Sequence, residues 1–294
     1  MPIYSVFNFN LQTSILLPEL FEVDRSPDVV LKFDKLSAYH YKHDGGFCYR
    51  GKISNILRFI VYDGKEIIIE PLNDVDLDLV RSALYGPIFS ILLRQLELLV
   101  LHGSCIALQD SVITFLGHSR AGKSTLAEAF YCQNYLVITD DVLAISLDTD
   151  YPQVLPSIPR IKLWPDSALA MGHQLEQLPP IHNNSSKRAH LLPQTSITTL
   201  PLSSIYILGQ SSEISITKLS PQQAFLELLK NTRAAKVLNH PSFVELHFKQ
   251  CTTLLHKIPT YLLSRPFDLS AVFKTIKEVE DHENRIHRTL SPTC

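Results

Sequence analysis

One short stretch, LGHSRAGKST, constrains the fold of this chain more than any other. Gly117, Gly122, Lys123 and Ser124 match the pattern G-x-x-x-x-G-K-[ST]. The apolar run VITFL precedes the stretch, and the amphipathic run KSTLAEAFYC follows it. This order predicts a strand, a phosphate-binding loop and a helix. The expected nucleotide-binding residues are Gly117, His118, Ser119, Arg120, Ala121, Gly122, Lys123, Ser124 and Thr125.

The loop residues indicate a nucleoside triphosphate as ligand. Its glycines let successive backbone N–H groups point at a phosphate, to which the helix N-terminus adds its positive end. Lys123 is expected to reach the β- and γ-phosphate oxygens, and the Ser124 hydroxyl is expected to ligate Mg²⁺. We therefore expect ATP as phosphoryl donor and Mg²⁺ as cofactor.

An acidic pair, Asp140 and Asp141, follows the run YLVIT. The interval between Lys123 and Asp140 leaves room for a helix, a short loop and a strand. The pair is therefore expected at the carboxyl end of a strand beside the loop strand, facing the γ-phosphate. One carboxylate could hold Mg²⁺ and the other could take a proton from an acceptor hydroxyl. The alternative is a turn, or a helix cap, without catalytic role.

His102 lies on the apolar run LVLHGSCIAL, which is expected to form a hairpin with VITFL. If the two strands are neighbours, the imidazole can approach the acidic pair and orient Asp140 or carry a proton. Spacing alone does not separate this role from that of a core histidine.

The rest of the chain predicts a mixed α/β protein, α+β overall, with two domains. Residues 1–85 read as a small β-rich domain, in which Asp63-Gly64 between FIVY and EIII favours a hairpin turn. Residues 86–294 read as the phosphate-loop domain. Here YLVITDD and VLAISL are expected as two strands, and residues 151–193 as irregular segments around a short helix near 167–171. Ser220-Pro221-Gln222-Gln223 predicts a capped helix start.

Composition narrows the class of protein. The net charge is −2 over 294 residues, with no basic patch, which disfavours nucleic acid as a partner. No apolar run approaches the ~18–20 residues of a membrane span, so we expect no membrane association. The five cysteines, without a C-x-x-C pair, favour a reducing cytoplasm. The twelve histidines are dispersed, and their spacing does not indicate a metal site.

The segments LHGSCIAL, VITFLGHSRAGKSTLA and YLVITDDVLAI together resemble the catalytic core of the HPr serine kinase/phosphorylase family. The smaller stand-alone HPr-kinase-like proteins, found beside lasso-peptide and other peptide-modification genes, are more similar still. YSVFNFNLQTSILLPEL and PSIPRIKLWPDSALAMG extend this resemblance to roughly two-thirds of the chain.

The resemblance implies a kinase domain of the HPr-kinase type, with a peptide hydroxyl as acceptor, such as a C-terminal Ser or Thr. It implies Asp140 as general base, Asp141 as the aspartate near the metal and His102 as support for the base. A homo-oligomer is also compatible with it. The glycine-rich stretch of the HPr enzymes is missing, and IPRIK at residues 158–162 stands in its place. HPr as substrate, and phosphorylase activity, are therefore disfavoured.

Three downstream cations, Lys187, Arg265 and Arg160, are candidates for phosphate or substrate contacts, and Trp164 is expected to be a packing anchor. Two alternatives to a peptide kinase stay open. One is a nucleotide-binding regulator or weak ATPase without a phosphoryl acceptor. The other is a small-molecule kinase.

Overall fold

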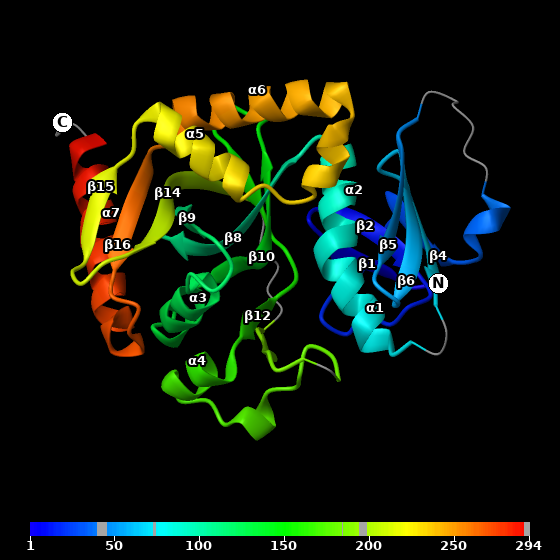
Figure 1. Ribbon diagram of the computed structural model, residues 1–294, viewed down its shortest axis with the longest axis horizontal. Coiled ribbons are helices and arrows are strands. Elements are labelled where there is room, and N and C mark those ends of the chain that lie inside the picture. Colours follow the sequence, from blue (N-terminus) through cyan, green and yellow to red (C-terminus); the bar gives the residue numbers. More distant parts are fainter. Residues whose placement is uncertain (40–45, 73–74, 184, 194–198, 291–294) are drawn as a thin grey trace.

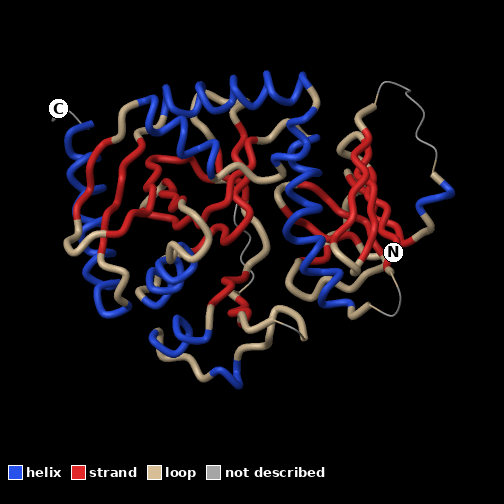
Figure 2. Tube along the Cα trace, viewed as in Figure 1, coloured by secondary structure: helices blue, strands red, loops and turns tan. Residues whose placement is uncertain are grey.

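A computed structural model describes residues 1–39, 46–72, 75–183, 185–193 and 199–290. These residues form a mixed α/β structure with two seven-stranded sheets and a two-stranded ribbon (Figures 1 and 2). The α/β class expected from the sequence is thereby confirmed.

The first sheet is built from the N-terminal residues, in the order β3-β1-β2-β4-β7-β6-β5. Its strands are β1 (Ile3–Val6), β2 (Phe9–Thr13), β3 (Phe21–Glu22), β4 (Val29–Phe33), β5 (Cys48–Ile53), β6 (Leu57–Tyr62) and β7 (Glu66–Pro71). The expected hairpin turn joins β6 to β7. Asp63 and Gly64 both have positive φ, 51° and 66°, as a tight hairpin turn of the primed type requires.

Two short helices, α1 (Leu77–Ala83) and α2 (Phe89–Gln95), lie between the two sheets (Figure 1). A π-helical turn, Leu84–Ile88, connects them. Phe89 and Leu92 of α2 are fully buried in the same core cluster as Leu11 and Leu31 of the first sheet. Val142 of the second sheet belongs to this cluster too, so the core is continuous between the N-terminal sheet and the phosphate-loop sheet.

The second sheet carries the phosphate loop, in the order β11-β10-β8-β9-β14-β16-β15. Its strands are β8 (Leu99–Leu108), β9 (Ser111–Leu116), β10 (Val137–Ser146), β11 (Gln153–Leu155), β14 (Leu200–Gln210), β15 (Ser215–Lys218) and β16 (Thr260–Arg265). The β8–β9 hairpin is as expected. The acidic pair, however, does not end a strand that neighbours β9. β10 runs on through both aspartates as one strand, and β8 lies between β10 and β9.

Helices cover both faces of this sheet (Figure 1). α3 (Lys123–Cys132) and α7 (Val272–Leu290) share a core with Phe115 and Tyr206 on one face. α5 (Pro221–Lys230) and α6 (Pro241–Lys257) pack on the other, through Leu228 and Leu254. α5 starts with the expected capping box, because the Ser220 hydroxyl accepts from the Gln223 N–H and the Gln223 side chain accepts from the Ser220 N–H.

Residues 151–193 are more regular than the sequence indicates. The short helix is present as α4 (Pro165–Ala170), but β12 (Arg160–Leu163) and β13 (Arg188–Leu191) form an antiparallel ribbon that we did not expect. Its strands are four residues each, too short for a periodic pattern to stand out. We call β12, α4, β13 and the residues connecting them the flap.

Two further expectations concern cysteines and the membrane. All four cysteines among the described residues are free thiols, and the fifth, Cys294, lies outside the described residues. Within the described ranges, no helix combines the length and the apolar character needed to cross a bilayer.

Candidate phosphate-binding and catalytic site

A cavity of about 780 Å³ opens where the phosphate loop, β10 and the flap meet. Ser124, both aspartates of the acidic pair and His102 line it. Five basic residues also line it: Arg120, Lys123, Lys162, Lys187 and Arg265. A concave site of this size with convergent charged groups is typical of a small-molecule site, and its cations suit a polyphosphate.

The loop backbone has the shape of a phosphate cradle. Gly122, the residue before α3, has φ +89°, and a Cβ there would lie 2.2 Å from Nη2 of Arg265. The backbone conformation favours glycine at this position, and any other residue would also displace the end of the Arg265 side chain. Among the described residues, no side chain caps the start of α3, and its first turn holds no acidic residue. The first N–H groups of the helix are thus open to an anion.

Lys123 folds back onto the loop. Its Nζ donates to the carbonyl oxygens of Gly117 at 2.7 Å and His118 at 3.0 Å. Burial lowers the pKa of Lys123 to about 8, and the charge of Asp140 opposes this shift. Within the described residues, the Lys123 ammonium donates to these two neutral carbonyls, and a phosphate would offer it a negatively charged acceptor.

Asp140 is the carboxylate nearest to the loop. Its Oδ1 accepts hydrogen bonds from the hydroxyls of Ser124 at 2.9 Å and Ser104 at 2.6 Å, and its Oδ2 accepts from the Lys162 N–H at 3.0 Å. The side chain is buried. These three donors fix the carboxylate beside the hydroxyl that the loop pattern assigns to Mg²⁺.

Asp141 lies among cations. Its Oδ2 is 2.7 Å from Nζ of Lys162, and its Oδ1 forms an ion pair with Nη2 of Arg233. Desolvation, followed by the charge of Arg160, lowers the pKa of Lys162, and the charge of Asp140 opposes this shift. Asp141 also has φ +93°, a left-handed conformation that non-glycine residues rarely adopt and that clusters at functional sites.

His102 reaches the acidic pair from the neighbouring strand β8. Its Nδ1 lies 3.1 Å from both the backbone oxygen and Oδ1 of Asp141. Burial, followed by the charges of Lys123 and Arg233, lowers the pKa of His102 to about 3. The imidazole is therefore neutral near pH 7. Because both partners of Nδ1 are acceptors, Nδ1 carries the proton, which leaves Nε2 as an acceptor. The expected proximity of His102 to the pair is found.

Sequence reasoning missed the segment Asn231–Arg233, which follows α5. Asn231 is buried, and its Oδ1 accepts from the N–H of Gly117 at 2.9 Å, while its backbone oxygen accepts from the N–H of His102 at 2.7 Å. Arg233 pairs with Asp141. The segment thus touches the loop, the histidine and the acidic pair at once. The run NTRAA carries no motif that would have revealed this role.

Behind this segment lies a buried polar network that includes His247 of α6. Nη1 of Arg94 donates to Nδ1 of His247 at 2.9 Å, so Nε2 carries the ring proton and donates to Oγ1 of Thr232 at 3.0 Å. Burial and the Arg94 charge lower the pKa of His247 to about 4. Cys251, one helical turn further on, has its Sγ 3.7 Å from Nε2.

The three downstream cations have different positions. Nη2 of Arg265, at the end of β16, donates to the Ala121 carbonyl at 3.0 Å, and its Nε has no hydrogen-bond partner within the described part of the chain. Lys187 lines the cavity with its Nζ over the Trp164 ring. Arg160 is not among the cavity-lining residues; it is buried over the Tyr85 ring, with its Nη1 3.7 Å from a Glu19 carboxylate oxygen.

The other loop side chains also differ in position. Ser119, Arg120 and Thr125 line the cavity, whereas His118 and Ala121 contribute backbone carbonyls to the contacts with Lys123 and Arg265. Trp164, which was expected to be a packing anchor, is partly buried. It lines the cavity between two cations, with the guanidinium of Arg120 5.0 Å from its ring centroid.

Comparisons with known proteins complete the description. No protein-family model and no curated protein matches the chain. Among solved structures, the HPr(Ser) kinase/phosphatase from Coxiella burnetii matches with 10% sequence identity and a TM-score of 0.35. The match covers 64% of this chain and 98% of the other.

Proposed function

We propose that the chain is an ATP-dependent kinase that transfers the γ-phosphoryl group to a hydroxyl, most simply that of a Ser or Thr in a peptide or small protein. One observation carries the proposal: a phosphate loop with an open helix N-terminus faces two carboxylates across one cavity. A loop alone would support nucleotide binding. Phosphoryl transfer to a hydroxyl also requires a group that orients the acceptor and takes its proton. The carboxylates beside the loop are suited to both tasks.

The residues around Ser124 fit Mg²⁺. The Ser124 hydroxyl and the Asp140 carboxylate lie 2.9 Å apart, and such hard oxygen donors are the ligands that Mg²⁺ prefers. When bound, Mg²⁺ neutralises charge on the β- and γ-phosphate oxygens. Lys123 would add a positive charge next to the same oxygens by exchanging its carbonyl contacts for phosphate.

The proposed transfer is a single displacement. The oxygen of the acceptor hydroxyl forms a new bond to the γ-phosphorus while the bond from that phosphorus to the β,γ-bridging oxygen breaks. ADP leaves, and the hydroxyl proton passes to an aspartate. Nδ1–H of the neutral His102 faces the backbone oxygen and Oδ1 of Asp141, and would hold the backbone and side chain of Asp141 in place. Arg265, which lines the cavity beside the loop, would add positive charge next to the phosphates.

The two aspartates can share this work in two ways. The family resemblance assigns Asp140 as the base and Asp141 as the residue near the metal. The contact of Asp140 with Ser124 favours the reverse division, because it puts Asp140 next to the expected metal ligand. Asp141 is bound by two cations, which weakens a carboxylate as a base, and this observation favours Asp140 for that role.

Kinetics of two variants would decide between these divisions. If Asp140 serves the metal, Asp140→Asn raises the Mg²⁺ concentration needed for half-maximal rate, and saturating Mg²⁺ restores much of the rate. If Asp140 is the base, the variant lowers kcat at every Mg²⁺ concentration by roughly 10²–10⁴-fold. Asp141→Asn should show the complementary behaviour.

Two other functions are distinguishable from a peptide kinase. A nucleotide-binding regulator or weak ATPase would bind ATP and transfer phosphate only to water. A small-molecule kinase would phosphorylate a free hydroxyl compound. The cavity extends past the loop to Trp164, Ser186 and Phe267, which leaves room for an acceptor beside the nucleotide.

The test uses purified protein, Mg²⁺ and ATP labelled on the γ-phosphate. Acceptors would be peptides ending in Ser or Thr, HPr and small hydroxyl compounds. Asp148→Asn is the matched control, since Asp148 is exposed just beyond the end of β10. Label should appear on a peptide with wild type and the control, and should fall sharply with Asp140→Asn at limiting Mg²⁺. Binding of ATP without transfer to any acceptor, unchanged in Asp140→Asn, would refute the kinase and support the regulator.

A further inference from the structure

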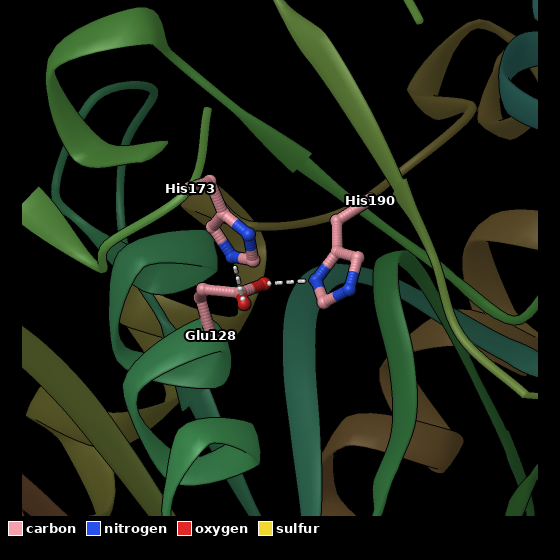
Figure 3. Close-up of side chains that lie close together, drawn as sticks. All are labelled: Glu128, His173 and His190. Carbon is pink, nitrogen blue, oxygen red and sulfur yellow. Dashed lines mark hydrogen bonds and ion pairs between the residues drawn. The ribbon is translucent and has the colours of Figure 1, made fainter. Parts of the chain in front are cut away.

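A second cluster of chemically active side chains lies outside the cavity. Glu128 of α3, His173 after α4 and His190 of β13 converge, as Figure 3 shows, with both rings directed at one carboxylate. Nε2 of His173 is 2.7 Å from Oε1 of Glu128, and Nδ1 of His190 is 2.9 Å from Oε2. None of the three lines the cavity described above.

The burial of this cluster is unusual for a carboxylate. Glu128 is fully buried, whereas the two histidine side chains are 22% and 17% exposed. A buried carboxylate needs positive charge close by. One ring nitrogen of each histidine faces the Glu128 carboxylate within hydrogen-bond distance, and a divalent cation bound between the three groups would place positive charge at that point.

The ligand atoms are close enough to share one ion. One atom from each of the three residues lies within 4.8 Å of the others. Bonds of about 2.0–2.2 Å to nitrogen and oxygen in a tetrahedral arrangement put ligands roughly 3.3 Å apart. The two observed separations are slightly shorter than this, so small side-chain movements would open the site.

A candidate fourth donor lies on the same helix, outside the group of three residues whose ligand atoms lie within 4.8 Å of one another. Cys132 follows Glu128 by one helical turn, and its Sγ is 3.9 Å from Oε1 of Glu128. Two imidazoles, a carboxylate and a thiolate form a mixed N, O and S donor set. Such a set suits Zn²⁺, which accepts all three donor types in four-coordinate sites, and does not suit Mg²⁺.

We propose that Glu128, His173 and His190 bind a structural Zn²⁺ ion, with the Cys132 thiolate as fourth ligand. The ion would join the helix that follows the phosphate loop to the flap. That flap carries Lys162, which contacts both aspartates of the acidic pair. Zinc would thus hold the flap against α3 and keep the cavity in shape. The proposal does not depend on the kinase function, because it concerns metal binding alone.

Sequence spacing could not reveal this cluster. Its two histidines and its glutamate come from three separate segments, and neither histidine has a second one at helical spacing. The pairing of β12 with β13 places His190 opposite Ile161, on a ribbon that also contacts α3, the helix that carries Glu128.

The test is a metal titration of the full chain. After removal of metal with a chelator, the protein would be titrated with Zn²⁺ against a chromophoric competitor, and its metal content measured by mass spectrometry. We expect about one Zn²⁺ per chain and an increase in Tm on binding. His173→Ala and His190→Ala should each weaken binding at least about 100-fold, since even residues behind a ligand are worth 10–100-fold. His256→Ala, on the exposed side of α6, is the matched control and should bind as wild type does.

Cobalt substitution tests the fourth ligand. Co²⁺ in a tetrahedral site with a thiolate gives a sulfur-to-cobalt charge-transfer band, which Cys132→Ser should remove. Absence of that band in wild type would overturn the role of Cys132. Less than about 0.1 Zn²⁺ per wild-type chain after reconstitution, with no change in Tm, would overturn the whole site. Equal affinity in His173→Ala and His256→Ala would overturn it too. The wild-type titration decides the question even if a variant does not fold.

Discussion

The ion pairs around Asp141 predict an asymmetric response to mutation. Asp141 is paired with two cations, Lys162 and Arg233, and the three side chains are 18%, 13% and 23% exposed. Asp141→Asn removes the carboxylate that pairs with both cations and leaves the charge of Asp140 acting on them. Lys162→Met, in contrast, leaves the carboxylate paired with Arg233. The aspartate variant should therefore be the less stable of the two.

The magnitudes follow from this geometry. Removing one partner of a buried ion pair costs about 3–5 kcal/mol, and partial exposure reduces this to about 2–4 kcal/mol for Asp141→Asn. Lys162→Met should cost about 1–2 kcal/mol, because its backbone N–H keeps the bond to Asp140. Asp141→Asn alone leaves the Lys162 charge without its partner, and the double variant removes that charge as well. The free-energy cost of the double variant should therefore be smaller than the sum of the two single costs by about 1–3 kcal/mol.

The measurement is urea unfolding without nucleotide at pH 7.5, for wild type, both single variants and the double variant. Lys187→Met is the control, since its ammonium lies over the Trp164 ring and not on a carboxylate; we expect a change below about 0.5 kcal/mol. The reasoning is refuted if Asp141→Asn costs less than about 1 kcal/mol, the value of a surface pair. It is refuted equally if the costs of the two substitutions simply add.

Three further predictions concern other parts of the structure. Gly122→Ala should weaken ATP binding at least about 10-fold by calorimetry, because the added Cβ meets Arg265 in a left-handed conformation that itself costs about 1–2 kcal/mol; unchanged affinity would contradict the loop geometry. Asn231→Leu leaves the Gly117 N–H without its acceptor and should destabilise the fold by about 1–3 kcal/mol in urea unfolding, unlike an exposed asparagine substitution such as Asn284→Leu on α7. His247, with its pKa lowered to about 4, takes up a proton more readily when unfolded, so its contribution to stability is complete above about pH 6.5 and is lost as the pH falls toward 4. His247→Gln should therefore show a shallower loss of stability between pH 6.5 and 4 than wild type, and equal slopes would exclude this role.

Local signals in the sequence were sufficient for much of the fold. The phosphate loop fixed β9 and α3, and the capping box fixed the start of α5. These features depend on residues close together in the chain. Strand order depends on packing between distant segments, and for that reason β8 was not expected between β9 and β10.

The residues of the candidate site likewise fall into those that local sequence signals identify and those that only the folded chain brings together. The loop, the acidic pair and His102 were identified from motifs and from a family resemblance, and the structure brings them together. Arg233 and Asn231 complete the charge and hydrogen-bond pattern, yet nothing in their immediate sequence distinguishes them from surface residues. Arg160 was expected from the sequence as a candidate phosphate or substrate contact, but in the structure its guanidinium lies near the Glu19 carboxylate.

The sequence predicted a break between two strands at the acidic pair, and the structure shows an irregular backbone conformation there, at Asp141. Successive side chains of a regular strand point to opposite faces, so two adjacent aspartates on β10 could not both serve one cavity. The positive φ of Asp141 breaks that alternation, and both carboxylates then contact Lys162, one at its N–H and the other at its Nζ. Such a conformation costs about 1–3 kcal/mol and persists only where surrounding contacts hold it. The ion pairs of Asp141 with Lys162 and Arg233 supply that hold, so the charges that position the carboxylate also maintain the backbone that lets the pair act together.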